Sequence, residues 1–341
     1  MTASIISARW TKLVATPRLC RSSHILSADA SRIFIFGGEL LPRQPVDNHV
    51  DQIDIDADLK ELRSKVNTLP APDNAPSARV GSASVTVNGS IWLFSGRGGL
   101  AMDAIEENGS LWRYEGTSST WQQILTKSTT YPTSRSYHAM AFDGKKTIYL
   151  HAGCPSQGRL SDLWAFDTET LVWTELPSAP GPARGGTSIA FCEGQLYRMG
   201  GFDGKSEQGG ELDIYDPASQ EWHTIAFLSD GVQGPEARSV ATLLAVRLPS
   251  NENALITMFG ERDPSSLGHA GAGKMLDDVW VFNVKTSTWS KAAFSEQNGP
   301  AGRGWFAADV MTQQGGDAVI VQGGLAEDNS RLGDAWRLDF L

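Results

Sequence analysis

The segment TIYLHAG (residues 147–153), followed by LWAFDTETLVW (residues 163–173), decides the fold because both parts recur along the chain. The first part is a short apolar run that ends in small residues. It returns as IFIFGG (33–38), IWLFSG (91–96), QLYRMGG (195–201), ALITMFG (254–260) and AVIVQGG (318–324). The last glycine of each run recurs at a mean interval of about 57 residues: Gly38, Gly96, Gly153, Gly201, Gly260 and Gly324.

The second part aligns without gaps with LWRYEGTSSTW (111–121), LDIYDPASQEW (212–222) and VWVFNVKTSTW (279–289). Each copy predicts a strand, a tight turn and a returning strand that carries a tryptophan. Upstream of every glycine run, an arginine precedes a further apolar strand. These arginines are Arg21, Arg79, Arg135, Arg184, Arg238 and Arg303. Each unit therefore contains four strands.

Four antiparallel strands repeated at this period are typical of a propeller blade, and the whole chain resembles kelch repeats. The resemblance implies an all-β, six-bladed kelch β-propeller. The expected blades cover residues 20–66, 79–126, 135–177, 184–227, 238–293 and 303–341. The last blade lacks a fourth strand, and the N-terminal ARWTKL supplies one, so we expect residues 8–14 to complete it. Six periods fill residues 1–341, which predicts a single domain.

Composition narrows the classes of partner and compartment. The chain has 29 basic and 39 acidic residues, and this negative balance argues against binding to nucleic acid. No apolar run approaches the ~18 residues of a membrane span, and the N-terminus lacks the apolar region of a secretory signal. Three cysteines form no disulfide framework, so we expect a reducing, cytoplasmic location. No phosphate-binding glycine loop, G-x-S-x-G elbow or C-x-x-C pair is present.

The strand order places the loops after the six glycines, and the residues around the six arginines, on one face at the mouth of the central channel. The loop after Gly260 is about 17 residues long, and loops of this length are usually functional. We expect a pocket here. The candidate residues are Glu39, Arg97, Tyr137, His138, Arg159, Glu261, Asp263, His269 and Trp305, and His24 has a position comparable to that of His138.

These residue types suggest two kinds of site. Arg97 and Arg159 are suited to clamp a sulfate, a carboxylate or another flat anion. Glu261, Asp263 and His269 lie on one loop and form a candidate site for a divalent metal.

Structural roles compete with these functions. The six repeated arginines are expected to pair with backbone or carboxylates between blades. Arg159 also fits a solvated loop cation, and Glu39 and Glu261 also fit caps of loop amides. Cys154 and Cys192 are expected in the core.

Four segments carry a narrower resemblance: residues 36–50, 95–99, 261–282 and 299–305. They are similar to the nitrile-specifier, epithiospecifier and thiocyanate-forming proteins, kelch propellers that use Fe(II) to direct the breakdown of glucosinolate aglucones. The iron ligands of that family follow E-x-x-x-D-x-x-x-H. Glu261 and His269 match this pattern, whereas Ser265 occupies the middle position and Asp263 lies two residues early. A hydroxyl is a poorer Fe(II) ligand than a carboxylate, so we expect iron to bind weakly.

The resemblance also implies that Arg97 and Arg159 hold the sulfate of the substrate and that Trp305 lines the pocket. We therefore predict a small-molecule enzyme that catalyses a redox-neutral rearrangement, elimination or ring formation. The expected catalytic residues are Glu261, His269 and Arg97. The expected substrate-binding residues are Arg97, Arg159, Trp305, Glu39, Tyr137 and His138. The alternative is an interaction module that binds a peptide partner through the same face.

Overall fold

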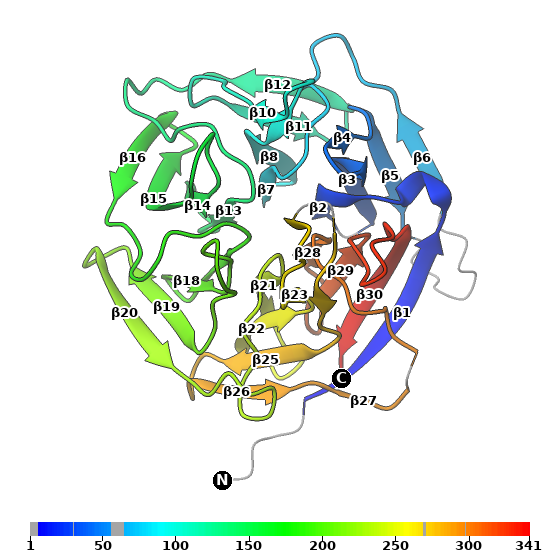
Figure 1. Cartoon of the computed structure of the whole chain (residues 1–341), viewed down its shortest axis with the longest axis vertical. Coiled ribbons are helices and arrows are strands. Elements are labelled where there is room, and N and C mark those ends of the chain that lie inside the picture. The colour runs from blue at the N-terminus through cyan, green and yellow to red at the C-terminus, as the bar shows by residue number, and fades with distance from the viewer. Residues whose placement is uncertain (1–5, 30, 56–64, 269–270, 297) are drawn as a thin grey trace.

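Six four-stranded blades surround a central axis in the computed structural model, which describes residues 6–29, 31–55, 65–268, 271–296 and 298–341 (Figure 1). The helical content of these ranges is a single 3-10 turn, η1 (Pro17–Leu19). The all-β, six-bladed prediction is confirmed. No helix in the described ranges is long and apolar enough to cross a membrane.

The strands of each blade follow one another from the axis outward. The innermost strands are β2 (Ser22–Ala28), β7 (Ala83–Val87), β13 (Ala139–Phe142), β17 (Ser188–Cys192), β21 (Thr242–Arg247) and β28 (Ala307–Met311). The second strands carry the glycine runs: β3 (Arg32–Leu41), β8 (Ser90–Phe94), β14 (Thr147–Gly153), β18 (Gln195–Met199), β22 (Asn253–Met258) and β29 (Ala318–Gln322).

The outer two strands form the tryptophan hairpins in blades two to five, whereas those of blade one carry no tryptophan and blade six pairs its third strand with the N-terminal strand that carries Trp10. The third strands are β5 (Val50–Asp54), β11 (Leu111–Glu115), β15 (Leu160–Asp167), β19 (Glu211–Asp216), β25 (Val279–Asn283) and β30 (Asp334–Phe340). The outermost strands are β6 (Val66–Leu69), β12 (Thr120–Ile124), β16 (Val172–Leu176), β20 (Glu221–Ala226), β26 (Thr288–Lys291) and β1 (Ser7–Ala15). Short strands also lie in the loops: β4 (Gln44–Pro45), β9 (Arg97–Gly98), β10 (Asp103–Ala104), β23 (Glu261–Arg262), β24 (Lys274–Met275) and β27 (Ala293–Phe294).

The sixth blade joins the two ends of the described chain, as the sequence predicted. Strand β1 runs antiparallel beside β30, with Trp10 opposite Leu338 (Figure 1). The other edge of β1 pairs in parallel with β27 through Ser7 and Ala293. Pairing strands from opposite ends of the sequence closes the ring and covers an edge that would otherwise be open.

The outer tryptophans pack in the core between blades. The ring of Trp173 in the third blade lies 4.9 Å from that of Phe166 and 5.7 Å from that of Phe94 in the second blade. Its indole N–H donates to the carbonyl of Gly109 at 2.7 Å. Each such side chain buries a large apolar area between blades, which is why tryptophan recurs at this position, although the indole N–H groups of Trp121 and Trp289 have no hydrogen-bond partner in the described structure.

The six repeated arginines are buried, and their guanidinium groups bond within their own blades rather than between blades. Arg238 donates to the carbonyl of Phe259 at 3.0 Å and to the Asp278 carboxylate at 2.7 and 3.0 Å. Five of the six have such a carboxylate partner; in the described part of the chain Arg184 has none. The bond between blades comes from the arginine backbone, whose carbonyl accepts from the last glycine of the preceding blade.

That last glycine is required by backbone conformation and by packing. Its φ lies between +87° and +114° in all six blades, in the region that side chains disfavour. A Cβ at Gly201 would also lie 2.9 Å from both Arg184 Cδ and Thr187 Cβ. These two constraints together account for the glycine spacing that revealed the repeat.

A closed ring of six backbone hydrogen bonds encircles the axis at the mouth of the channel. Each member lies two residues after a repeated arginine and has a positive φ: Ser23, Gly81, Tyr137, Gly186, Val240 and Trp305. The N–H of each donates to the carbonyl of the member in the preceding blade at 2.7–3.1 Å, and Ser23 completes the cycle by donating to Trp305. The ring links all six blades and presents the Tyr137 and Trp305 side chains at the mouth.

Candidate functional site

A cavity of about 200 Å³ lies over this ring on the face that carries the glycine loops. Four ring residues contribute to its lining, namely Tyr137, Gly186, Val240 and Trp305. Loops of the third, fourth and fifth blades supply the rest: Cys154, Arg159, Gly185, Phe202, Ser239, Glu261, Pro264, Ser265 and Gly268. Of the residues predicted from the sequence, the structure therefore brings Tyr137, Arg159, Glu261 and Trp305 together.

One repeated position of the blades lies at this site. The residue after the last glycine of each blade forms a bridge to the residue after a repeated arginine, as Phe202 does with Gly185 and Glu261 with Ser239. Across the six blades these residues are Glu39, Arg97, Cys154, Phe202, Glu261 and Leu325. Only the charged ones among these six residues were predicted from the sequence to belong to the site. Phe202 was not predicted as a site residue and Cys154 was expected in the core, although both line the cavity.

Arg159 supplies a positive charge that no ion pair in the described ranges neutralises, although this charge adds to the backbone hydrogen bonds that lower the pKa of the nearby Asp203. Its guanidinium lies over the ring of Phe202, with 5.1 Å between the guanidinium carbon and the ring centroid. Its Nε is buried without a hydrogen-bond partner, and no carboxylate in the described ranges forms an ion pair with it. An aromatic face orients a cation without cancelling its charge. Arg159 is therefore available to bind an anion in the cavity.

Glu261 presents a carboxyl group with an altered affinity for protons. The residue is 5% exposed, and its Oε1 accepts a hydrogen bond from the Gly273 backbone at 2.6 Å. Burial, reinforced by the negative charge of Glu207, raises the pKa of Glu261 to about 7. A carboxyl with this pKa exchanges protons readily near neutral pH.

Two further acidic residues lie on the Glu261 side of the site. Burial and the nearby charges of Asp263 and Asp203 raise the pKa of Glu207, whose Oε1 has no hydrogen-bond partner in the described structure. Asp263 does not line the cavity, and its backbone has a positive φ of 50°. The site therefore combines the cation of Arg159 with a group of acidic residues, of which Asp203 acts on both Arg159 and Glu207.

Aromatic residues form much of the remaining wall. Burial raises the pKa of the Tyr137 hydroxyl to about 12, so this group is neutral and can take part in hydrogen bonds. Trp305, Val240 and Phe202 complete a largely apolar surface.

Arg97 lies outside the cavity lining and is committed to protein acceptors. It donates to Ser136 Oγ at 2.7 Å and to the carbonyls of Met102, Cys154 and Pro155 at 3.2, 3.3 and 2.6 Å. These bonds brace the segment that carries Cys154 into the site.

Glu39 and His138 also lie outside this lining. Glu39 forms an ion pair with Arg331 at 3.1 Å and accepts from the Arg43 backbone at 2.7 Å. The His138 ring packs at 5.6 Å from Phe94 of the neighbouring blade, and burial lowers its pKa to about 3. His24, in the corresponding place, is buried with a similarly lowered pKa.

The described part of the predicted iron site does not form a ligand set. His269 lies outside the described residues. Within the described ranges no group of three histidine, cysteine, aspartate or glutamate side chains is arranged to hold a metal. The Ser265 hydroxyl oxygen accepts a hydrogen bond from the Leu267 backbone at 3.2 Å. These donors do not fit an Fe(II) centre by themselves.

Comparisons with known proteins agree with this architecture. A sulfolyase from Thlaspi arvense, named for N-(sulfonatooxy)prop-2-enimidothioate, is 25% identical over 93% of this chain and 91% of its own length. This similarity confirms the predicted resemblance to specifier-type proteins. A solved structure, that of YjhT, shares the fold with a TM-score of 0.69 at 14% identity and covers 95% of both chains.

Regulatory proteins with kelch repeats match as well. Leucine-zipper-like transcriptional regulator 1 of Mus musculus is 23% identical over 78% of this chain and 30% of its own length. An F-box/kelch-repeat protein of Arabidopsis thaliana is 25% identical over 78% of this chain and 55% of its own length. The family model described as the KLHDC2/KLHL20/DRC7 Kelch-repeats domain matches residues 23–260, and this chain belongs to that kelch-repeat family.

Proposed function

We propose that this kelch propeller is an enzyme that converts a small anionic molecule in the cavity over the backbone ring. The reaction class is a redox-neutral elimination, rearrangement or ring formation. One observation carries the proposal: Arg159, without a carboxylate partner in the described ranges, lines the same cavity as Glu261. A free cation and a proton-exchanging carboxyl at one small site are suited to chemistry on an anionic substrate.

The substrate class follows from the charge and size of the site. A guanidinium binds oxyanions such as carboxylate, phosphate and sulfate through directed hydrogen bonds, and Phe202 leaves its outer N–H groups free to do so. A cavity of about 200 Å³ accommodates only a small molecule or one end of a larger one. The Thlaspi arvense relative is named for a sulfonatooxy compound, which supports a sulfate-bearing substrate here.

The proposed reaction assigns separate tasks to the two residues. The bond between the substrate and its sulfonate-bearing oxygen breaks, and the electron pair leaves with that oxygen as sulfate. A neighbouring group of the substrate forms a new bond at the vacated atom with its own electron pair. Arg159 stabilises the charge that develops on the leaving group. Glu261 accepts or donates the proton that the rearranging substrate requires, because its pKa of about 7 makes both forms available. No oxidant or reductant is needed.

Iron binding is a separable proposal. Glu261, Asp263 and His269 are the residues that would hold Fe(II), with an affinity in the micromolar range or weaker, because Ser265 replaces a carboxylate. When bound, such an ion supplies Lewis-acid polarisation of the substrate. The task of Arg159 does not depend on it, whereas a Glu261 carboxylate that held the ion would not exchange protons with the substrate.

Turnover of N-(sulfonatooxy)prop-2-enimidothioate by the purified protein tests the enzyme proposal. Arg159→Ala should raise KM and lower kcat, so that kcat/KM falls at least tenfold, and Glu261→Gln should lower kcat at least tenfold. Arg262→Ala is the matched control, since Arg262 is a half-buried arginine of the same loop that is paired with Glu236 and does not line the cavity, and this variant should leave both constants unchanged. If both the Arg159→Ala and the Glu261→Gln proteins turned over the substrate with wild-type kinetic constants, the assignment would be refuted.

The interaction-module alternative rests on a different observation. Leu40, Leu41, Leu100 and Leu267 are exposed on the loops that follow the glycine runs, and regulatory kelch proteins are among the relatives. Exposed apolar side chains on one face are frequent in protein interfaces. Pull-down with wild type and a Leu41→Ser/Leu100→Ser double variant separates the two functions. Loss of a specific partner would favour the module, and identical partner sets would remove this face as the binding surface.

A further inference from the structure

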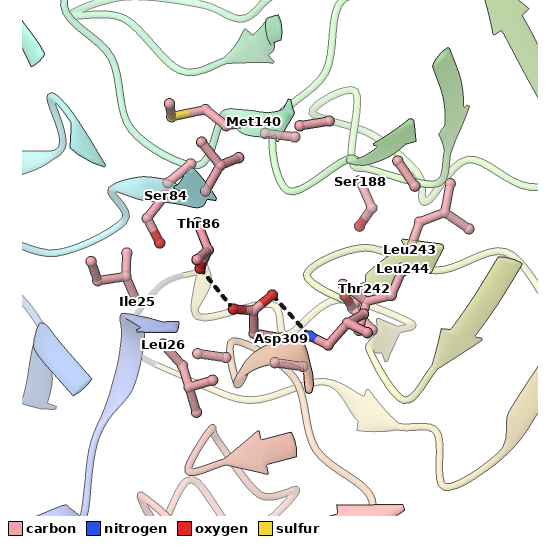
Figure 2. Close-up of a pocket in the computed structure, with 18 of the residues that line it drawn as sticks. Ile25, Leu26, Ser84, Thr86, Met140, Ser188, Thr242, Leu243, Leu244 and Asp309 are labelled. Atoms are coloured by element: carbon pink, nitrogen blue, oxygen red, sulfur yellow. Dashed lines mark hydrogen bonds between the residues drawn. The ribbon is translucent and has the colours of Figure 1, made fainter. Parts of the chain in front are cut away.

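A second cavity, of about 670 Å³, occupies the central channel on the other side of the backbone ring. Its walls are the innermost strands of all six blades, and its volume is within the range of ligand-binding cavities. Figure 2 shows the hydroxyl groups of Ser84, Thr86, Ser188 and Thr242 on these walls, with the Asp309 carboxylate among them.

Protein donors hold the Asp309 carboxylate in a defined orientation. Oδ2 accepts from the Ala28 backbone at 2.9 Å and from Thr86 Oγ1 at 3.0 Å, and Oδ1 accepts from the Val310 backbone at 2.8 Å. These bonds connect the sixth blade with the first and second. A carboxylate has about four lone-pair sites, so Oδ1 retains the capacity to accept from a ligand.

The charge of Asp309 has no cationic partner in the channel. The described residues that line the cavity include no lysine or arginine. Their other titratable side chains are His24, which stays neutral because burial lowers its pKa to about 3, and Asp29, which pairs with Arg32 at 2.9 Å. Burial raises the pKa of Asp309 to about 6, so at neutral pH the channel contains an ionised carboxylate without a counter-ion.

We propose that the channel binds a small organic ammonium ion that carries a hydroxyl group. The ammonium donates to Oδ1 of Asp309, and the hydroxyl bonds to wall hydroxyls such as those of Ser188 and Thr242. An organic cation fits better than a metal ion, because the channel offers a single free carboxylate and the described residues form no three-ligand group. Apolar wall residues such as Met140 and Leu244 suit the methylene groups of such a ligand.

The backbone ring separates this site from the proposed enzymatic pocket. The ring residues and the residues that follow them line a third cavity of about 120 Å³. That cavity shares Tyr137 and Trp305 with the proposed pocket, and His24 and Phe306 with the channel, so the backbone ring lies between the two sites.

Calorimetric titration with ethanolamine tests the proposal, with ethylene glycol as the neutral probe of matched length. The wild type should bind ethanolamine at pH 8 and bind it about tenfold more weakly at pH 5, where a carboxyl of pKa about 6 is mostly protonated. Asp309→Asn should weaken binding at least tenfold. Equal affinity of the wild type and Asp309→Asn, or equal affinity for the two probes, would overturn the proposal.

A second variant covers the case in which Asp309→Asn disturbs the bonds to Ala28 and Thr86. Ser188→Leu narrows the channel from the fourth blade without removing any bond to Asp309, and it should abolish ethanolamine binding while circular dichroism shows a native fold. Wild-type affinity in Ser188→Leu would also overturn the proposal. Arg159→Ala should leave ethanolamine binding unchanged, which separates this site from the enzymatic one.

Discussion

The guanidinium of Arg159 lies 5.1 Å over the aromatic ring of Phe202, although the two residues come from different blades. Arg159 precedes the third strand of blade three, and Phe202 follows the glycine pair of blade four. This contact orients a positive charge beside the cavity without neutralising it. We therefore expect the anion affinity of this site to depend on an uncharged neighbour.

Replacing that neighbour should weaken anion binding. A cation–π contact contributes about 1 kcal/mol, so Phe202→Leu should reduce the affinity for inorganic sulfate about fivefold. Phe202→Tyr keeps an aromatic face and should retain most of the affinity. Titration calorimetry at constant ionic strength gives both values. Equal sulfate affinity in the leucine variant and the wild type would show that Phe202 has no part in orienting Arg159.

Glu261 should make stability depend on pH in a specific direction. Its pKa in the folded state, about 7, lies above the ordinary value, so the folded protein favours the protonated form. The stabilisation is complete below the ordinary pKa of about 4.5 and is lost as the pH rises through 7. Glu261→Gln removes this pH-dependent loss of stability, because glutamine does not ionise. Urea unfolding should therefore show the variant gaining stability relative to wild type between pH 5 and pH 8, by up to about 3 kcal/mol.

The matched control for that experiment is Glu39→Gln. Glu39 has the same register position in the first blade, but its carboxylate is paired with Arg331. This variant should lose stability at both pH values, because Arg331 would then be buried without its counter-ion. A Glu261→Gln protein whose stability relative to wild type does not change with pH would contradict the interpretation.

The glycine at the end of each second strand should resist substitution more than other glycines with a positive φ. Gly201→Ala combines backbone strain with a Cβ 2.9 Å from two neighbouring carbons, and should cost about 2–4 kcal/mol. Gly194 has a φ of +82° with open space around it, so Gly194→Ala should cost only about 1 kcal/mol. Chemical unfolding of the pair isolates the packing contribution. Similar losses in both variants would assign the glycine requirement to φ alone.

The buried arginines should differ in their contribution to stability. Arg238→Met leaves the Asp278 carboxylate buried without its cation and should destabilise the fold by about 3–5 kcal/mol. Arg184 has no carboxylate partner within the described ranges, and burial together with the charge of Arg198 lowers its pKa to about 10. Arg184→Met should therefore cost less than Arg238→Met. Comparison of the two unfolding free energies tests this, and the reverse order would refute it.

Iron affinity should respond to the residue between Glu261 and His269. Anaerobically purified wild type should contain substoichiometric iron by elemental analysis. Ser265→Asp introduces a carboxylate at the middle position of the family pattern and should raise Fe(II) affinity at least tenfold, because a carboxylate is the better ligand. Ser266→Asp, one residue further along, is the control and should leave the affinity unchanged. Stoichiometric, tightly held iron in the wild type would contradict weak binding.

The sequence by itself determined the fold, because the repeat is set by local backbone requirements. A glycine with φ near +100° is needed wherever a second strand meets the next blade, and in five of the six blades a tryptophan of the outermost strand fills the gap between blades. The unmatched strands at the two ends likewise determined that the last blade is shared. The shared face of the loops and the involvement of Tyr137, Arg159, Glu261 and Trp305 in one cavity were also predictable, since both follow from strand direction and register.

Only the tertiary structure decided which charges are free to act. Glu39 pairs with Arg331, which lies 292 residues away in the sequence. Arg97 donates hydrogen bonds to backbone carbonyls of the third blade. Asp309 was not predicted as a site residue from the sequence. The groups that bind its carboxylate belong to Ala28 and Thr86, which are both more than 200 residues distant. Local spacing sets the path of the backbone, but the partners of a charged side chain depend on which distant strands the closed ring brings beside it, and those partners determine whether it remains available to a ligand.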